Sequence, residues 1–233
     1  MAVETFMASN QALQREITVY SHDREPPTRL FLFLDAEFYL DRMGIAEKVQ
    51  SQLHKDTAFA FVAHIDNLHR HRDYICSPSF SAFAGNAVLG EIQHRFPTLH
   101  DTGHLVGGLS LSGLAAAHLL EVFPERFDGA LCQSGSFWWN DEWLTDNMPR
   151  TTGKRLYISV GDKETQKGIS HQPSGMRQEV SQFDSCTRFA EQMKIQGNEV
   201  RLKTFHAGHE MEPWETEWIE AVDWMLLPKN RHF

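Results

Sequence analysis

The sequence predicts an α/β domain whose mostly parallel sheet is covered by helices on both faces. Three observations lead to this prediction. Short apolar runs that are typical of strands alternate along the chain with segments of helical spacing. Some of these runs, such as residues 30–34, are apolar at every position, which is typical of strands buried on both faces of a parallel sheet. A glycine-rich turn at residues 107–114 joins one apolar run to a helical pattern.

The predicted strands begin with one that is only half buried. Residues 15–20 alternate apolar and polar side chains, whereas the runs that follow are more uniformly apolar and indicate interior strands. A last alternating run, residues 199–205, closes the series. The full set of predicted strands is 15–20, 30–34, 59–65, 104–106, 129–132, 156–160 and 199–205.

Helical spacing of apolar residues predicts a helix between most pairs of strands. Pro97 and Gly197 follow two of these helices and explain where they end. The predicted helices are 43–53, 82–96, 114–123, 183–196 and 214–227. Residues 140–152 and 163–179 show no such period and are predicted to be loops near the functional site.

Composition limits the class of protein. The chain has 22 Lys and Arg against 31 Asp and Glu, a formal net charge of -9, which argues against general binding to nucleic acid or to an anionic membrane. Three cysteines without a C-x-x-C pair make a disulfide framework or a structural zinc site improbable. No apolar run is long enough to span a membrane, and the N-terminus does not look like a secretory signal. We expect one domain, residues 1–233, in the cytoplasm, and the oligomeric state stays open.

The glycine-rich turn is the most informative segment for function. A serine at such a strand-to-helix turn is typical of the nucleophile elbow of α/β-hydrolases, where small neighbours permit a strained backbone. Ser110 fits the G-x-S-x-G pattern with Gly108 before it and Ser112 in place of the second glycine. Ser112 as the nucleophile would put the bulky Leu114 at a glycine position, so Ser110 is preferred.

Acidic and histidine residues follow two later strands of the predicted sheet. Asp162 and Glu164 come after the strand at 156–160, and His206 and His209 come after the strand at 199–205. Serine, acid and histidine in this chain order are typical of an α/β-hydrolase triad. His209 is preferred as the base because it follows a glycine and precedes the final helix. The spacing leaves Asp162 and Glu164 nearly equal as the acid.

Several segments together resemble the enterochelin (enterobactin) esterases, the trilactone siderophore hydrolases of the esterase-D-like branch of the α/β-hydrolases. The resemblance rests on the elbow segment 107–114, on 123–127, and above all on the run Gln-Ser-Gly-Ser-Phe-Trp-Trp at 133–139. It extends to the segments 34–38, 66–73 and 208–214, and so covers nearly the whole chain.

The resemblance implies a set of roles and a substrate class. Ser110 would be the nucleophile, His209 the base and Glu164 the acid, although some members of the family use a Ser/His dyad. The backbone N–H groups of Leu111 and Glu37 would form the oxyanion hole. No cofactor is implied, and the partner is a small-molecule ester, in the family a catecholate trilactone.

Two substitutions and the chain length depart from the family pattern. Ala36 and Ser112 stand where the family has glycine. The cytoplasmic enterochelin esterases that the chain resembles carry an N-terminal domain, for which 233 residues leave no room. We therefore expect a hydrolase that consists of the catalytic domain.

A cluster of basic and aromatic residues suggests how a large aromatic trianion would be held. Guanidinium groups donate to catecholate oxygens and stack on aromatic rings, and indoles add flat apolar surface. The expected substrate-binding residues are His69, Arg70, Arg72, Trp138 and Trp139. The alternative is that Arg72 forms a solvated ion pair with its neighbouring aspartate and that the tryptophans belong to the core.

Three other interpretations stay open. The first is a general carboxylesterase or acyl hydrolase of the same fold, acting on feruloyl, thioester or small acyl substrates. The second is a hydrolase-like binding module without activity, which would predict a lost nucleophile or base. The third is a metal site made of His69 and His71 in the predicted loop at residues 66–73, for which alternating histidines are weak evidence.

Overall fold

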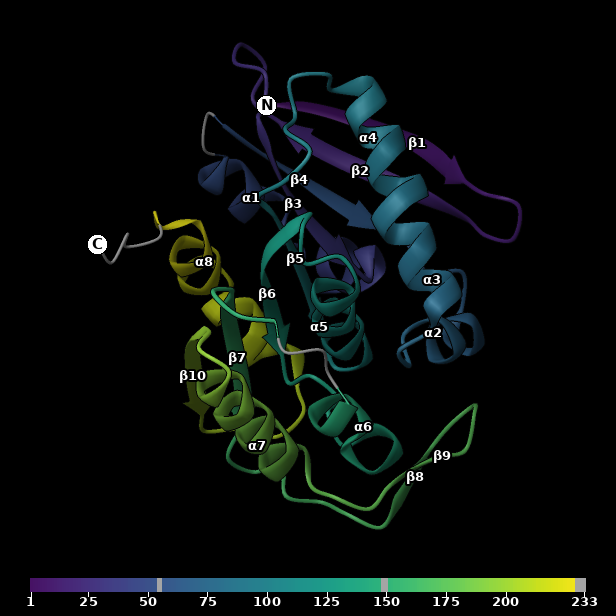
Figure 1. Cartoon of the computed structure of the whole chain (residues 1–233), viewed down its shortest axis with the longest axis vertical. Coiled ribbons are helices and arrows are strands. Elements are labelled where there is room, and N and C mark those ends of the chain that lie inside the picture. Colours follow the sequence, from purple (N-terminus) through teal and green to yellow (C-terminus); the bar gives the residue numbers. More distant parts are fainter. Residues whose placement is uncertain (54–55, 148–150, 229–233) are drawn as a thin grey trace.

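An eight-stranded sheet forms the centre of the molecule in the computed structural model, which describes residues 1–53, 56–147 and 151–228. The strands lie in the order β1-β2-β4-β3-β5-β6-β7-β10. Their bounds are β1 Ala2–Ser9, β2 Gln14–Ser21, β3 Arg29–Leu34, β4 Thr57–Val62, β5 His104–Leu109, β6 Phe127–Gln133, β7 Arg155–Gly161 and β10 Glu199–Phe205. Figure 1 shows the sheet running through the molecule, with β1 and β10 toward its two ends.

The strand directions divide the sheet into two parts. The pairs β1–β2 and β2–β4 are antiparallel, and every pair from β4 through β3, β5, β6 and β7 to β10 is parallel. All six residues of β4 and of β5 are buried, as expected for strands with helices on both faces. The carboxyl ends of the parallel strands therefore meet at one edge of the sheet, where ligand sites form in such folds.

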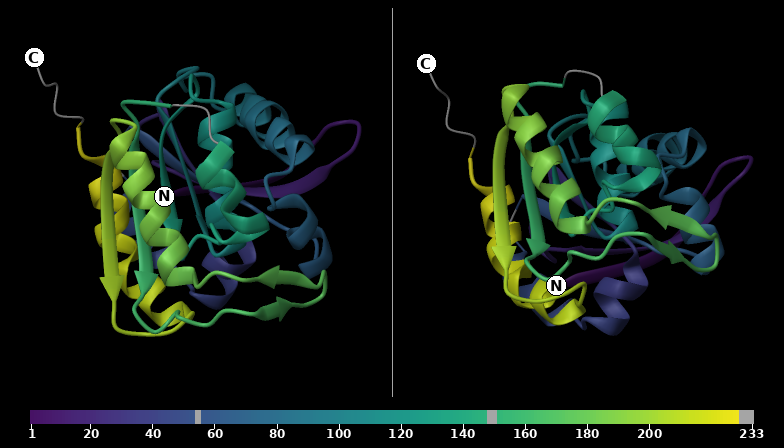
Figure 2. Two further views of the ribbon diagram at one scale, coloured as in Figure 1. Left: turned by 60° about the horizontal axis from the view of Figure 1, so that its bottom comes forward. Right: turned by 90° about the horizontal axis from the view of Figure 1, so that it is seen from below.

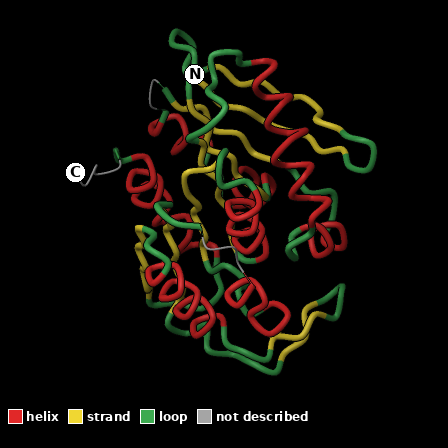
Figure 3. Tube along the Cα trace, viewed as in Figure 1, coloured by secondary structure: helices red, strands yellow, loops and turns green. Residues whose placement is uncertain are grey.

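Helices cover both faces of the sheet, as the tube in Figure 3 shows. The helical elements are η1 Glu37–Arg42, α1 Ala46–Gln52, α2 Asn67–Asp73, α3 Pro78–Ala82, η2 Phe83–Val88, α4 Leu89–Arg95, α5 Leu111–Val122, α6 Trp139–Asn147, α7 Gln182–Ile195 and α8 Met211–Leu226. One hydrophobic cluster packs α3, α4, α5 and α7 against the sheet, and a second packs α1 and α8 against its other face. The predicted α/β architecture is confirmed.

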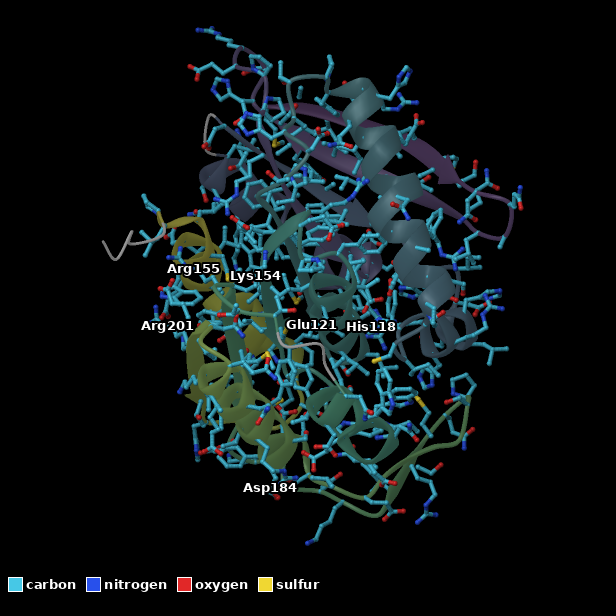
Figure 4. The ribbon with its side chains drawn as sticks, in the orientation of Figure 1. His118, Glu121, Lys154, Arg155, Asp184 and Arg201 are labelled. Carbon is cyan, nitrogen blue, oxygen red and sulfur yellow. The ribbon has the colours of Figure 1, made fainter. Side chains whose placement is uncertain are left out.

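Most predicted elements are present with shifted ends. The helix expected at 82–96 is one helical run made of α3, η2 and α4. The helix expected at 43–53 begins only at Ala46, because residues 37–42 already form the wider turns of η1. Helix α7 begins at Gln182, where the Ser181 side chain caps it by accepting from the Asp184 backbone N–H. Figure 4 labels Asp184 at this end of α7, where a negative charge complements the helix dipole.

Several other elements were not predicted from the sequence. The edge strand β1 was not predicted, and α2 occupies the segment that was read as a loop of alternating histidines. The loop expected at 140–152 is wrong over α6, although its residues Asn140, Asp141 and Glu142 have positive φ and interrupt the helix. Its later residues 148–150 lie outside the described part of the chain. The loop expected at 163–179 contains a hairpin, β8 Ile169–His171 and β9 Met176–Gln178.

The hairpin β8–β9 reaches away from the body of the sheet. Figure 2 shows it extending from the end of β7 toward the region of α2. Its tip is attached there, because His71 Nδ1 of α2 lies 2.8 Å from the Ser174 hydroxyl. Within the described residues, no helix has the length and hydrophobicity needed to cross a membrane.

Candidate active site

Ser110 lies at the sharp turn between β5 and α5. Its backbone angles are φ 54° and ψ -120°, a strained conformation for any residue with a side chain. Gly108 permits the turn, since a Cβ there would lie 2.2 Å from the backbone oxygen of Ser112. The Ser112 hydroxyl is buried and bonds to the backbone of the same turn: it donates to the Leu109 carbonyl and accepts from the Leu109 N–H. Ser110 alone of the two serines therefore presents its hydroxyl to the cavity described below.

His209 joins Ser110 to Glu164. Its Nε2 lies 3.0 Å from Ser110 Oγ, and its Nδ1 lies 2.5 Å from Glu164 Oε2. The three residues come from three connections at the carboxyl edge of the sheet, after β5, β7 and β10. The Glu164 side chain is 1% exposed and the His209 ring 43% exposed, so the acid is shielded from water while the imidazole faces the opening. This is the geometry that nucleophilic catalysis by a serine requires.

The second acid and the second histidine of the same two connections form a separate pair. Asp162 Oδ2 lies 2.7 Å from His206 Nδ1, and the two side chains are 40% and 78% exposed. Neither residue lines the cavity that Ser110 opens into. The structure therefore brings Glu164 and His209 to Ser110, and leaves Asp162 and His206 at the surface.

Glu164 is held by a full set of hydrogen-bond donors. Its Oε1 accepts from the Gly161 backbone N–H at 2.8 Å and from the Ser134 hydroxyl at 2.7 Å. Its Oε2 is left for His209. A buried carboxylate supported in this way keeps a fixed orientation, so the ring of His209 is fixed with it.

A cavity of about 640 Å³ opens over Ser110, a size typical of small-molecule sites. One wall is the hairpin β8–β9, which contributes Ile169, His171, Met176 and Gln178. Trp138 forms part of the floor, where its indole stacks on the His171 ring at a centroid distance of 4.8 Å. The cavity thus combines aromatic surface with several polar groups close to the serine.

A buried ion cluster supports the opposite side of the cavity, behind the turn after β3. Asp35 is fully buried, and its two carboxylate oxygens share the single N–H of Arg70 Nε while Oδ2 also accepts from Arg70 Nη2, at 2.6–2.9 Å. Burial alone would raise the pKa of Asp35, but Arg70 and His64 outweigh it and the pKa lies below its ordinary value. The Arg70 guanidinium also lies over the ring of Phe38, 4.8 Å from its centroid, and both residues line the cavity.

His64 completes this cluster between two carboxylates. Its Nδ1 lies 3.1 Å from Asp35 Oδ1 and 2.9 Å from Glu37 Oε2. Burial disfavours the charged ring, but the two carboxylates outweigh burial and raise the pKa of His64 to about 9. The backbone of Glu37 follows Asp35 at the start of η1, so the cluster fixes the turn from which the second oxyanion donor is expected.

The predicted substrate-binding residues divide into two groups. Arg70 and Trp138 line the cavity. His69, Arg72 and Trp139 do not: His69 contacts Asp66 at the start of α2, Arg72 contacts Asp73 with 61% of its side chain exposed, and Trp139 packs against the hydrophobic core. Trp138 is buried by the cavity wall, with its Nε1 donating to Gln182 at 2.5 Å.

Two histidines also line the cavity, of which the sequence suggested His71 only as a metal ligand and His171 not at all. His71 and His171 come from α2 and from β8, and both line the cavity. The pKa of His71 is lowered by burial first and then by the nearby charges of Arg70 and His171. The position of His71 at the cavity follows from residues 67–73 forming a helix, and the predicted loop at 163–179 gave no reason to choose His171 among its residues. Within the described residues, no group of three or more His, Cys, Asp or Glu side chains could hold a metal ion.

The fold and this site define an α/β-hydrolase: a mostly parallel sheet with helices on both faces, and a serine at a strained strand-to-helix turn. The model of the Esterase family, described as "Putative esterase", matches residues 10–225. The chain belongs to this family.

Similar proteins include siderophore esterases of bacteria and fungi. The iron(III) enterobactin esterase of Dickeya dadantii is 27% identical over 227 residues, which cover 91% of this chain and 52% of that protein. The siderophore triacetylfusarinine C esterase of Aspergillus fumigatus is 26% identical over 132 residues, 53% of this chain and 44% of that protein. The chain spans about half the length, or less, of the curated relatives that it matches.

Solved structures show the same fold. The enterobactin esterase from Shigella flexneri, crystallised in the presence of enterobactin, superposes with a TM-score of 0.80 at 19% identity, over 97% of this chain and 59% of that one. A ferulic acid esterase superposes with a TM-score of 0.70 at 14% identity, over 96% of each chain. The shared fold is thus common to esterases with different substrates.

Proposed function

We propose that this protein hydrolyses the ester bonds of a siderophore-type substrate, a catecholate trilactone, with Ser110 as nucleophile, His209 as general base and Glu164 as the acid. The observation that supports this most strongly is the position of His209, with Nε2 3.0 Å from Ser110 Oγ and Nδ1 2.5 Å from Glu164 Oε2. No other described histidine contacts the hydroxyl of the elbow serine.

In the acylation step, Ser110 Oγ attacks the ester carbonyl carbon while its proton passes to His209 Nε2. Glu164 stabilises the imidazolium that forms. The carbonyl oxygen becomes an oxyanion, for which the backbone N–H groups of Leu111 and Glu37 are the proposed donors. When the ester C–O bond breaks, the leaving alcohol takes the proton from His209, and the acyl group stays on Ser110.

Deacylation repeats the same sequence with water. His209 removes a proton from a water molecule, and the hydroxide attacks the acyl-enzyme carbonyl. The bond to Ser110 Oγ breaks, and His209 returns the proton to the serine. A trilactone contains several equivalent esters, so the linear product of one turnover is a substrate for the next.

The substrate class is proposed from the cavity and from the relatives. The cavity is lined by the aromatic rings of Phe38 and Trp138, by His171, and by Arg70, whose guanidinium is held by Asp35. An aromatic acyl group with anionic oxygens matches this combination of flat surface and donors. The similarity of the chain to proteins named as enterobactin and triacetylfusarinine C esterases supports a siderophore-type substrate.

A substrate panel tests the proposal. We would compare kcat/KM for a ferric catecholate trilactone, the iron-free trilactone, a feruloyl ester and a short p-nitrophenyl ester. We expect the trilactones to be the best substrates and Ser110→Ala to hydrolyse none of the four. A panel in which feruloyl or p-nitrophenyl esters are preferred would replace the siderophore proposal with a general carboxylesterase.

A further inference from the structure

Ser134 is a fully buried hydroxyl that the acylation and deacylation steps do not use. It follows the last residue of β6, in the Gln-Ser-Gly-Ser run, and has a positive φ of 44°. Its backbone N–H donates to the Ser159 carbonyl, and its carbonyl accepts from the Gln182 side chain. The residue is therefore fixed by its backbone on two sides, which leaves its side chain aimed at Glu164.

The hydrogen bonds of Ser134 have only one possible direction. Its Oγ lies 3.0 Å from Trp214 Nε1 and 2.7 Å from Glu164 Oε1. An indole N–H can only donate, so the hydroxyl oxygen must accept from Trp214. The single hydroxyl proton is then free to point at Glu164, and an ionised carboxylate can only accept it.

This direction has a consequence for His209. With Oε1 of Glu164 occupied by Ser134 and Gly161, the second oxygen is the one that accepts from His209 Nδ1. A proton on Nδ1 leaves the lone pair of Nε2 toward Ser110, which is the tautomer that a general base needs. Trp214 also touches the ring directly, edge to face at a centroid distance of 4.8 Å.

We infer that Ser134 and Trp214 are positioning residues of the proposed triad: the Trp214 N–H orients the Ser134 hydroxyl, which orients Glu164 and thereby fixes the reactive tautomer of His209. The inference rests on the proposed function of Ser110, His209 and Glu164. Ser134 follows β6 and Trp214 lies near the start of α8. Neither the sequence nor the resemblance assigned a role to these two residues.

The pH dependence of this arrangement involves few other groups. Helix α7 packs against Glu164 with the buried Cys186, whose thiol stays neutral because burial, and then the charge of Glu164, raise its pKa far above the ordinary value. The connection after β7 adds Asp162, which is paired with His206, and the exposed Lys163. The connection after β10 adds His209 itself and Glu210, which also lines the cavity.

The test compares four variants of the full chain. Ser134→Ala removes the hydroxyl, and Ser134→Gly removes it while suiting the positive φ, so that a folded variant is available if alanine is not tolerated. Trp214→Phe keeps an aromatic ring and removes the N–H. Ser159→Ala is the matched control, because Ser159 is an equally buried serine whose hydroxyl donates to a different buried glutamate, Glu217.

Kinetics on a short p-nitrophenyl ester supply the first readout. A lost hydrogen bond to a charged group predicts a fall of kcat by roughly 10- to 100-fold in Ser134→Ala, with KM unchanged. The acidic limb of the kcat/KM profile should move to higher pH, because Glu164 loses a donor that favours its charged form. The fall in kcat should be smaller in Trp214→Phe. A double variant, Ser134→Ala with Trp214→Phe, should lose no more kcat than Ser134→Ala alone, whereas Ser159→Ala keeps the wild-type kcat and pH profile.

Proton NMR supplies a readout that does not depend on activity. The Nδ1 proton of His209, held against a carboxylate, should give a downfield resonance that is absent in His209→Ala. We expect this resonance to shift or disappear in Ser134→Ala and to stay in Ser159→Ala. Wild-type kinetics and an unchanged resonance in Ser134→Ala, with Ser110→Ala inactive, would overturn this inference alone. Activity retained by Ser110→Ala would overturn the proposed function, and the inference with it.

Discussion

Two acid–histidine pairs follow the same two strands of this molecule, and they differ in almost every physical respect. Glu164–His209 has a buried acid and a histidine directed at Ser110, whereas Asp162–His206 lies at the surface with both side chains largely in water. The distances within the pairs, 2.5 Å and 2.7 Å, are nearly equal. A short distance between acid and histidine therefore does not by itself identify the pair that can serve as the base and acid of a catalytic triad.

What separates the two pairs is the surroundings of the acid. Glu164 accepts from Ser134 and Gly161 in addition to His209, so one geometry is strongly preferred. An exposed pair such as Asp162–His206 competes with water and is screened by salt, and contributes little to stability. The comparison predicts that equivalent substitutions in the two pairs will have very different effects.

Removal of each histidine gives the largest expected difference. His209→Ala takes away the only proposed acceptor for the Ser110 proton, so kcat/KM should fall by about 10⁴-fold or more. His206→Ala should stay within about twofold of the wild type, since a lost surface pair costs little. Steady-state hydrolysis of a p-nitrophenyl ester measures both, and equal losses would show that the two pairs are not distinct.

Substitution of the acids tests the same comparison with a smaller effect. Glu164→Gln keeps the shape of the side chain but removes the charge that stabilises the imidazolium, and we expect kcat to fall by roughly 10²- to 10⁴-fold. Asp162→Asn should leave kcat unchanged. A Glu164→Gln enzyme with wild-type kcat would favour a Ser/His dyad, and a large loss in Asp162→Asn would exchange the roles of the two acids.

Arg70 and Arg72 extend the comparison of buried and exposed pairs to stability. Arg70→Met leaves the buried Asp35 charge without its main partner and should lower the free energy of unfolding by about 3–5 kcal/mol. Arg72→Met breaks only the exposed contact to Asp73 and should cost less than about 1 kcal/mol. Urea unfolding followed by circular dichroism measures both values. Similar losses would contradict the buried role assigned to Arg70.

Glu121 gives the smallest effect and a pH dependence of known sign. Burial raises the pKa of this α5 residue to about 7, and the hydrogen bond from Thr151 and the charge of Lys154 oppose that shift. Figure 4 labels Glu121 and Lys154. The folded pKa of Glu121 lies above the unfolded value near 4.5. The contribution of this residue to the free energy of unfolding is therefore greatest below pH 4.5 and is lost as the pH rises to 7. Glu121→Gln should remove this loss, on the order of 1–3 kcal/mol.

Unfolding titrations at pH 4.5 and pH 7.5 check this prediction. The wild type should lose more stability between the two values than Glu121→Gln does. Parallel losses in the two proteins would mean that Glu121 is charged in the folded state.

Local patterns in the sequence predicted the sheet and the serine turn because both depend on neighbouring residues. Apolar runs define the buried strands, and Gly108 with Ser110 defines the elbow, whose close contact with the Ser112 backbone excludes a larger side chain. The sequence spacing could not choose between Asp162 and Glu164, since both follow β7 and the choice depends on where β10 and its turn bring His209. Only the resemblance favoured Glu164.

The segment 67–73 shows why the substrate-binding residues were only partly predicted. Residues two apart on a helix point to nearly opposite sides, so α2 directs Arg70 inward to Asp35 and Arg72 outward to solvent. As a loop, the same segment suggested that both arginines face one ligand. The segment 163–179 lines the cavity as the sequence predicted, but its two strands were missed because each is only three residues long and mostly polar.

The identity of the nucleophile and its dependence on the buried pair can be measured directly by covalent labelling. A fluorophosphonate reacts with an activated serine, and peptide mass mapping locates the adduct. We predict a single adduct on Ser110 that forms at the wild-type rate in His206→Ala and Asp162→Asn, slowly in Glu164→Gln and not at all in His209→Ala. An adduct on Ser112, or equal labelling rates in Glu164→Gln and Asp162→Asn, would contradict the proposed triad.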